Sequence, residues 1–182
     1  MKIIVAITGA SGGAYAKLCL EQLLNAPEVN EIALIISDTA QEVLKFEGIT
    51  LPEGEKIVRF GNDDMFAPVA SGSAGYDAMV VVPASMGSVG RIASGVSLSL
   101  IERAADVMLK ERRRLIVVVR ETPYSLIHLR NMTTLTEAGA IVLPASPSFY
   151  SHPQTLTDAL QTVVERIISH LSVELPHYKW GE

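Results

Sequence analysis

The sequence predicts an α/β protein in which a Rossmann-like, doubly wound parallel sheet forms one three-layer α/β/α domain over residues 1–182. Short apolar runs rich in β-branched residues alternate along the chain with longer segments of helical periodicity. Small turns rich in glycine and serine follow several of these runs directly. This alternation is typical of βαβ units, whose strands are parallel and buried on both faces. No linker, repeat or low-complexity segment interrupts it, so we expect a single domain.

The apolar runs are the expected strands, and they lie at residues 2–7, 31–36, 79–82, 115–119 and 141–143. A further short strand is expected at 56–60. The run at 115–119 is wholly apolar and mostly β-branched, and it ends at the charged pair Arg120 and Glu121. Because open α/β sheets bind ligands at the carboxyl ends of their strands, this pair indicates a ligand site there.

Helices are expected at residues 14–24, from 38 to about 46, after 88, over the first half of 101–122, and at 125–138 and 156–171. Ser37 is expected to cap the second helix, although its hydroxyl also lies where a ligand phosphate would bind. In the fourth helix, Arg103, Asp106 and Lys110 share one face. That face is either an anion site or a solvated surface held by ion pairs. Residues 48–76 are expected to be irregular, as a lid, binding loop or oligomer contact.

Composition narrows the class of partner. The 182 residues are 48% hydrophobic and 19% charged, which is typical of a folded domain. The net charge of −5 and the lack of a long Lys/Arg run argue against a nucleic-acid partner. The single cysteine, Cys19, fits a reducing compartment, and no run of 18 apolar residues predicts a membrane span. We therefore expect a cytoplasmic protein without a membrane segment.

Three turns rich in small residues are expected to meet at one edge of the sheet. The turn at residues 8–13 joins a strand to a helix through three glycines, which is typical of a phosphate cradle. Its alternative is a tight turn that binds no ligand. Together with Ser37 and the turn at 83–88, it favours a flat, phosphorylated ligand.

Several chemistries are disfavoured by the same residues. Tyr15 replaces the last glycine of a dinucleotide fingerprint, and no tyrosine has a lysine four residues later, so a nicotinamide dehydrogenase is disfavoured. No serine in a nucleophile elbow follows a strand. A metal site is not expected, because the histidines lack ligand spacing. These histidines are His128, His152, His170 and His177.

Five motifs in order carry a resemblance to a known family. They are T-G-A-S-G at 8–12, P-A-S-M-G-S at 83–88, L-I-E-R-A-A-D-V-M-L-K-E-R-R at 100–113, V-R-E-T-P at 119–123 and P-A-S-P-S-F-Y-S-H-P-Q at 144–154. This combination resembles the UbiX-type flavin prenyltransferases over nearly the whole chain. The resemblance implies a metal-independent transferase that joins the dimethylallyl group of dimethylallyl phosphate to N5 and C6 of reduced FMN. The product, prenylated FMN, would serve a UbiD-type decarboxylase, and the enzyme would be a homo-oligomer, a dodecamer with sites between subunits.

The resemblance also implies roles for individual residues. Expected flavin contacts are Gly9, Ala10, Ser11, Ser37, Ser85, Met86, Gly87, Ser88 and Arg120. Residues expected around the donor are Arg103, Lys110, Tyr150, Arg166 and Trp180. Glu121 would handle protons through Ser11, and Glu47 is a secondary acid. Met65 departs from an aromatic residue found in some relatives, which leaves that wall of the donor pocket unassigned and Phe66 as a substitute.

Two alternatives remain open. One is an FMN-dependent cysteine decarboxylase, a class that shares the sheet but resembles P-A-S-A-N-T at the third turn, where this chain has S-M-G-S at 85–88. That class would not need the cations Arg103, Lys110 and Arg166. The other alternative is a carrier that binds flavin without changing it.

Overall fold

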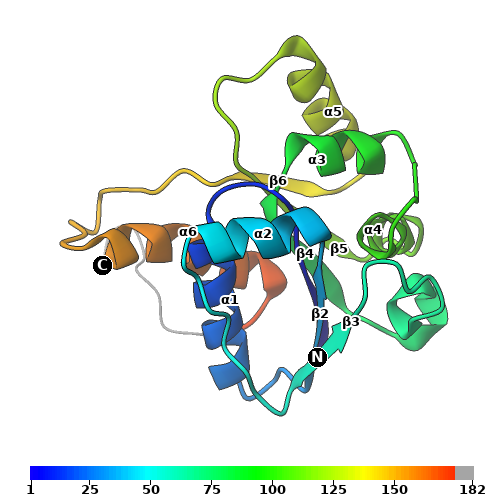
Figure 1. The fold of residues 1–182 in the computed structure, drawn as a ribbon, viewed down its shortest axis with the longest axis horizontal. Helices are drawn as coiled ribbons and strands as arrows, with labels where there is room; N and C mark the ends of the chain where they lie inside the picture. Colours follow the sequence, from blue (N-terminus) through cyan, green and yellow to red (C-terminus); the bar gives the residue numbers. More distant parts are fainter. Residues whose placement is uncertain (175–182) are drawn as a thin grey trace.

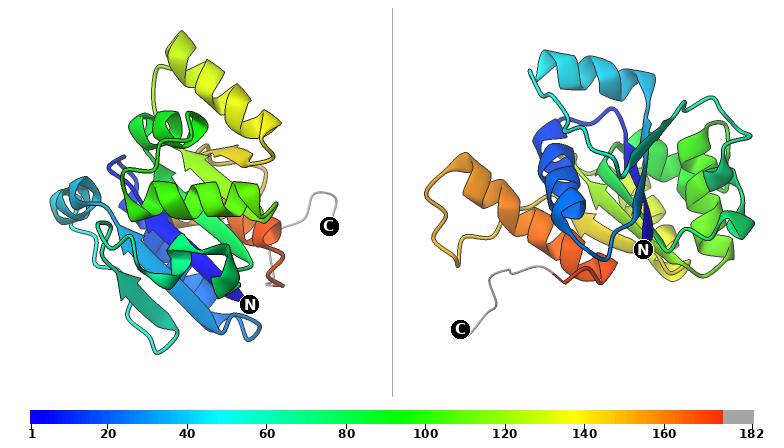
Figure 2. Two further views of the ribbon diagram at one scale, coloured as in Figure 1. Left: turned by 90° about the vertical axis from the view of Figure 1, so that its right-hand side faces the viewer. Right: turned by 90° about the horizontal axis from the view of Figure 1, so that it is seen from below.

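Six parallel strands form one sheet in the computed structural model, which describes residues 1–174, and their order is β3-β2-β1-β4-β5-β6. The strands are β1 (Lys2–Ile7), β2 (Glu31–Ile36), β3 (Ile57–Phe60), β4 (Ala78–Ala84), β5 (Arg114–Val119) and β6 (Ile141–Pro144). Helices lie on both sides of this sheet (Figures 1 and 2), so the predicted three-layer, doubly wound fold is confirmed. The additional short strand predicted near residue 57 is the edge strand β3.

The helices are α1 (Gly13–Asn25), α2 (Asp38–Phe46), α3 (Met86–Ala93), α4 (Leu100–Lys110), α5 (Leu126–Glu137) and α6 (Leu156–Leu171). Two short 3-10 turns, Pro68–Ala70 and Gly72–Ala74, lie in the segment predicted to be irregular. Four of the α-helices begin at a side-chain cap. The side-chain oxygens of Ser37, Ser85, Ser125 and Thr155 cap α2, α3, α5 and α6. Helix α5 packs against α3 and β6 and lies at the top of the view in Figure 1.

The core is two apolar layers separated by the sheet. Side chains alternate along each strand, so Ile3 and Val5 pack with α1 and α6, whereas Ile4 packs with α3 and α4 on the opposite face. The central strands β1, β4 and β5 are almost fully buried. Burial on both faces explains their continuous apolar sequences.

The strand order reverses between β1 and β4. Strand β1 pairs with β2 on one side and β4 on the other, and the chain leaves these two strands toward opposite faces of the sheet. A crevice therefore opens at their carboxyl ends. Thr8 fixes its floor, because its hydroxyl donates to the Pro83 carbonyl at 2.9 Å and accepts from the Ser85 amide at 2.7 Å.

Cys19 lies on α1 within the core and is a free thiol. Burial raises its pKa to about 12. Among the residues that the structure describes, no helix is long and apolar enough to cross a membrane.

The centre of β5 gives a test of this core. Ile116 is fully buried, so Ile116→Ala is expected to lower the free energy of unfolding by about 2–5 kcal/mol through lost packing and a cavity. Val58→Ala on edge strand β3, where the side chain is exposed, is the control and should change it by less than about 1 kcal/mol. Urea unfolding at one fixed protein concentration measures both. Equal losses in the two variants would contradict this description of the core.

Candidate active site

A cavity of about 240 Å³ lies at the carboxyl ends of the strands, between the loops that follow β1, β2 and β4. It is lined by Thr8, Gly9, Ser37, Thr39, Asn62, Ser85, Gly87, Ser88, Arg91, Ser99, Ile101 and Glu102. Most of these side chains carry hydroxyl, amide or charged groups. The cavity therefore suits the polar end of a ligand.

Close packing of α2 on the first turn determines which residues that turn contains. A Cβ atom at Gly9 would lie 2.4 Å from Cγ2 and 2.8 Å from Cβ of Thr39, so no side chain fits there without moving α2. Gly12 has a φ of 113°, a left-handed conformation that favours glycine. The two glycines allow the backbone after β1 to reach the cavity and then start α1.

Glu47 organises the same turn from the end of α2. Its carboxylate accepts hydrogen bonds from the amides of Gly12 and Gly13, both at 2.8 Å. Burial raises the pKa of Glu47, but hydrogen bonds from Ser11, Gly12 and Gly13 and the nearby charge of Arg120 outweigh burial and hold it below its usual value. Ser11, Glu47 and Arg120, predicted separately, are thus brought together.

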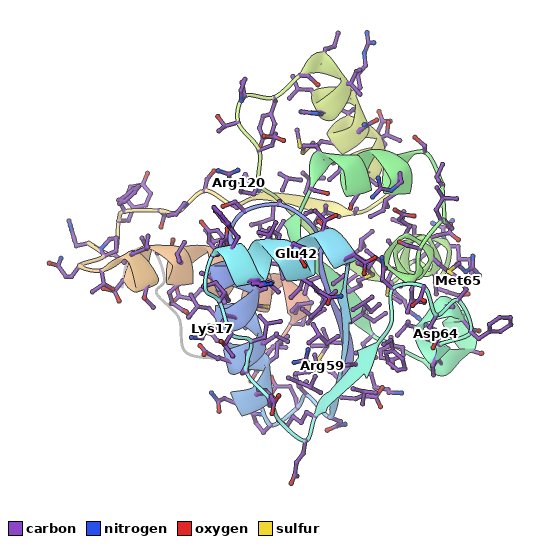
Figure 3. All side chains as sticks on the ribbon, in the orientation of Figure 1. Lys17, Glu42, Arg59, Asp64, Met65 and Arg120 are labelled. Carbon is purple, nitrogen blue, oxygen red and sulfur yellow. The ribbon has the colours of Figure 1, made fainter. Side chains whose placement is uncertain are left out.

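Arg120 and Glu121 follow β5, as predicted. The amide of Arg120 donates to the Ala84 carbonyl at 3.3 Å, which ties this segment to the end of β4. Figure 3 shows Arg120 at the same edge of the molecule as α2, far from Arg59 on β3. Glu121 is exposed, and its Oε1 accepts from the Thr122 amide at 2.9 Å.

The predicted flavin contacts divide into two groups. Gly9, Ser37, Ser85, Gly87 and Ser88 line the cavity, as a flavin site would require. The hydroxyls of Ser37 and Ser85 also cap α2 and α3, by accepting from Ala40 at 3.2 Å and from Ser88 at 3.4 Å. Of the others, Ala10 and Met86 are buried and Ser11 is exposed, and none of the three lines the cavity.

The residues predicted to bind the prenyl donor come from two regions of the chain, α4 and the region around β6 and α6. Arg103 donates to the Ala70 carbonyl at 3.1 Å and pairs with Asp106 at 2.7 Å. Lys110 pairs with Glu111 at the far end of α4. Arg166 lines a cavity of about 430 Å³ between β6 and α6.

Two further donor residues complete this set. Tyr150 is largely exposed in the segment after β6, which runs outward from the sheet in Figure 1. Trp180 lies outside the described residues. Within residues 1–174, one chain does not bring the predicted donor residues into one cavity.

Sequence reasoning missed Thr39, Asn62, Arg91, Ser99 and Glu102 in the cavity wall. The pattern Ser99-x-x-Glu102 before an apolar run is a helix-start signal and marks Glu102. Arg91 carries no such signal, because an arginine on a short helix has the pattern of a solvent-facing residue.

Comparison with known proteins identifies the family. A family model described as Flavoprotein matches residues 1–172. The flavin prenyltransferase UbiX of Methanocaldococcus jannaschii is 48% identical, with 100% of this chain and 99% of that protein aligned. This chain belongs to the UbiX flavin prenyltransferase family. The UbiX of Thermoplasma acidophilum is 45% identical over 95% of the chain and 96% of that protein. The resemblance seen in the five motifs is thereby confirmed.

Solved structures of the UbiX family agree with the fold. A dodecameric, FMN-dependent UbiX-like decarboxylase from Escherichia coli O157:H7 has a TM-score of 0.92 at 36% identity, with full coverage of both chains. AnUbiX (PadA1), in complex with FMN and dimethylallyl pyrophosphate, has a TM-score of 0.89 at 38% identity over 100% of this chain and 98% of that one. The peptidyl-cysteine decarboxylase EpiD, at 15% identity, 94% and 98% coverage and a TM-score of 0.61, shows the fold alone.

The contacts of Glu47 predict a pH-dependent contribution to stability. Glu47→Gln is expected to lower the free energy of unfolding by about 1–3 kcal/mol near neutral pH, because the amide cannot accept from both Gly12 and Gly13. Since the folded pKa of Glu47 is lowered, the carboxylate's contribution is fully present above its usual pKa of 4.5 and is lost as pH falls through the folded pKa.

Thermal or urea unfolding between about pH 3 and pH 7 measures this loss, and the two proteins should converge at the acid end. Glu42→Gln, on the exposed side of the same helix (Figure 3), is the matched control and should follow the wild type throughout. A difference between wild type and Glu47→Gln that stayed constant with pH would contradict this role.

Proposed function

We propose that this chain is a flavin prenyltransferase that joins the dimethylallyl group of dimethylallyl phosphate to N5 and C6 of reduced FMN, with release of phosphate. The observation that carries the proposal is 48% identity, over the whole chain, to a protein named as a flavin prenyltransferase. The polar cavity at the carboxyl ends of the strands supports it, because such a cavity suits the phosphate end of FMN.

The residues present fit reduced FMN as the prenyl acceptor. Ser37, Ser85 and Ser88 offer hydroxyls, and the starts of α2 and α3 offer backbone amides and positive dipole ends to a phosphate. Ser11 and Arg120 are exposed residues in the segments that follow β1 and β5, and we propose that they contact the ring system of FMN. When bound, reduced FMN supplies the two nucleophilic positions that form the new bonds.

The prenyl donor requires stabilisation of its departing phosphate. Arg103, Lys110 and Arg166 are suited to this task, since fixed cations compensate the charge that develops on the phosphate oxygens without a metal ion. Tyr150 adds a phenol. Cation–π attraction from an aromatic surface stabilises a developing allylic cation by about 0.5–2 kcal/mol.

Proton handling falls to acids near the rim. Bond formation at C6 requires loss of the proton on that carbon, and Glu121 is an exposed carboxylate at the end of β5. We propose that Ser11 relays this proton. Glu47 is held in its charged form by the β1–α1 turn, so it acts first by orienting Ser11.

The proposed donor site requires more than one subunit. Lys110 and Glu121 flank the two ends of β5, which has six residues. At a rise of about 3.3 Å per residue, roughly 20 Å separate these ends, which is too far for one small donor to bridge. We propose a homo-oligomer, a dodecamer like the Escherichia coli relative, with Lys110 supplied by a neighbouring copy.

The exposed surface supports this assembly. Several large apolar side chains outside the sheet are exposed in the single chain, and contacts with neighbouring copies would bury them. They include Phe46, Phe66, Leu98, Ile127, Phe149 and Leu156.

The product of the proposed reaction, prenylated FMN, is a cofactor for another enzyme. We propose that prenylated FMN passes to a UbiD-type decarboxylase, and that the reaction occurs in the cytoplasm, where the free thiol Cys19 would stay reduced.

The reaction itself tests the function. Purified protein incubated anaerobically with reduced FMN and dimethylallyl phosphate should yield a flavin heavier by one isoprene unit, detected by mass spectrometry. Parallel reactions with dimethylallyl diphosphate show which of the two esters is the prenyl donor. A cysteine decarboxylase or a flavin carrier would return unmodified FMN, so unmodified flavin with both donors would refute the proposal.

Mixed assemblies test whether the site is shared. Lys110→Ala and Glu121→Gln should each lower turnover by at least about 100-fold while FMN still binds, because neither residue is placed to hold FMN. In oligomers co-assembled from equal amounts of both variants, about one quarter of the shared sites would combine a native Lys110 with a native Glu121. Turnover should therefore return to about one quarter of the wild-type rate. No recovery would mean that both residues act within one chain or that Lys110 acts elsewhere.

A further inference from the structure

Arg91 and Glu102 form an ion pair in the wall of the cavity. Arg91 lies on α3 and Glu102 on α4, and the Nε of Arg91 donates directly to Oε1 of Glu102. The Nη2 of Arg91 lies 3.3 Å from the hydroxyl of Ser88. The proposed function gives neither Arg91 nor Glu102 a role, although both side chains line the cavity.

Glu102 is the buried member of this pair, since its side chain is only 4% exposed. Its Oε2 accepts from the amides of Leu98 at 2.8 Å and Ser99 at 3.0 Å. With Arg91 on its other oxygen, the carboxylate has three donors that compensate its charge. Glu102 is therefore fixed in place and leaves little negative potential for the cavity.

The guanidinium of Arg91 is held at Nε by Glu102, and within residues 1–174 its Nη1 is not hydrogen-bonded. The side chain is 45% exposed. The Nη1 atom lies 3.4 Å from the position that a Cβ at Gly87 would occupy, so it projects over the first turn of α3. A guanidinium fixed through Nε presents its remaining N–H groups in a planar fork that matches phosphate oxygens.

The rest of the cavity wall also favours an anion. Ser37, Ser85 and Ser99 are the residues that precede α2, α3 and α4, so the amino ends of three helices meet at this cavity. Helix amino ends carry partial positive charge. On the α3 side, Arg91 adds the outer N–H groups of its guanidinium to that arrangement.

We infer that Arg91, positioned by Glu102, binds the phosphate of FMN and gives this enzyme its preference for FMN over riboflavin. The inference rests on the proposed function, because it takes FMN as the ligand of the cavity. It assigns Arg91 as a binding residue and Glu102 as a positioning residue. The prenyl donor's phosphate is the other anion present, but the cations proposed for it lie outside this cavity.

Flavin selectivity tests the role of Arg91. Dissociation constants for FMN and riboflavin are measured by isothermal titration calorimetry on the full-length oligomer. Arg91→Gln is expected to weaken FMN binding about 10- to 100-fold, as loss of a charge-assisted hydrogen bond does, and to change riboflavin binding by less than about threefold. Arg91→Lys, which keeps the charge, should recover part of the preference. Arg59→Gln on β3 is the matched control, outside the cavity, and should behave as the wild type.

The positioning role of Glu102 requires a second measurement. Glu102→Gln should reduce the preference for FMN because Arg91 is no longer held, and the double variant should be no worse than Arg91→Gln alone. Melting temperatures establish that each variant is folded.

Equal weakening of FMN and riboflavin binding by Arg91→Gln, or a change only in the KM for dimethylallyl phosphate, would overturn the inference. Failure of the wild type to bind either flavin would instead remove the proposed function.

Discussion

The hydroxyl of Thr8 joins the two loops on which the site depends. It links the end of β1 to the end of β4, the two strands between which the strand order reverses. Because the chain leaves these strands toward opposite faces, their loops separate and leave a crevice, and the ends of β1 and β4 line it with small residues. These residues include Gly9 after β1 and Ser85 and Ser88 after β4. The cavity is thus a consequence of sheet topology, and its side chains adapt it to a phosphate.

Most of the fold follows from local sequence. The runs of Ile and Val predicted the central strands because both faces of a parallel sheet must be apolar, and Ser37 predicted where α2 begins. The edge strand β3 has a weaker hydrophobic pattern in the sequence, because an edge strand is less buried than a central one. The family motifs supplied the flavin turns, and Gly9, Ser85, Gly87 and Ser88 of those turns line one cavity.

The site was harder to predict wherever residues meet across elements. Helical spacing put Arg103 and Lys110 on one stripe, but it carries no information about which end of the sheet each residue reaches. Arg103 pairs with Asp106 near the carboxyl edge and Lys110 with Glu111 near the amino edge. Arg91 and Glu102 meet because α3 and α4 are adjacent, and neither sequence window contains that contact.

The single buried thiol has a consequence for an enzyme that handles reduced flavin. Dihydroflavins react with oxygen and release hydrogen peroxide, which oxidises thiolates rather than thiols. Cys19 is the one cysteine in the sequence, and it lies on the face of α1 that packs into the core. Its pKa of about 12 keeps the thiol protonated. Burial in the core therefore shields the thiol of Cys19 from the by-product of the enzyme's own substrate.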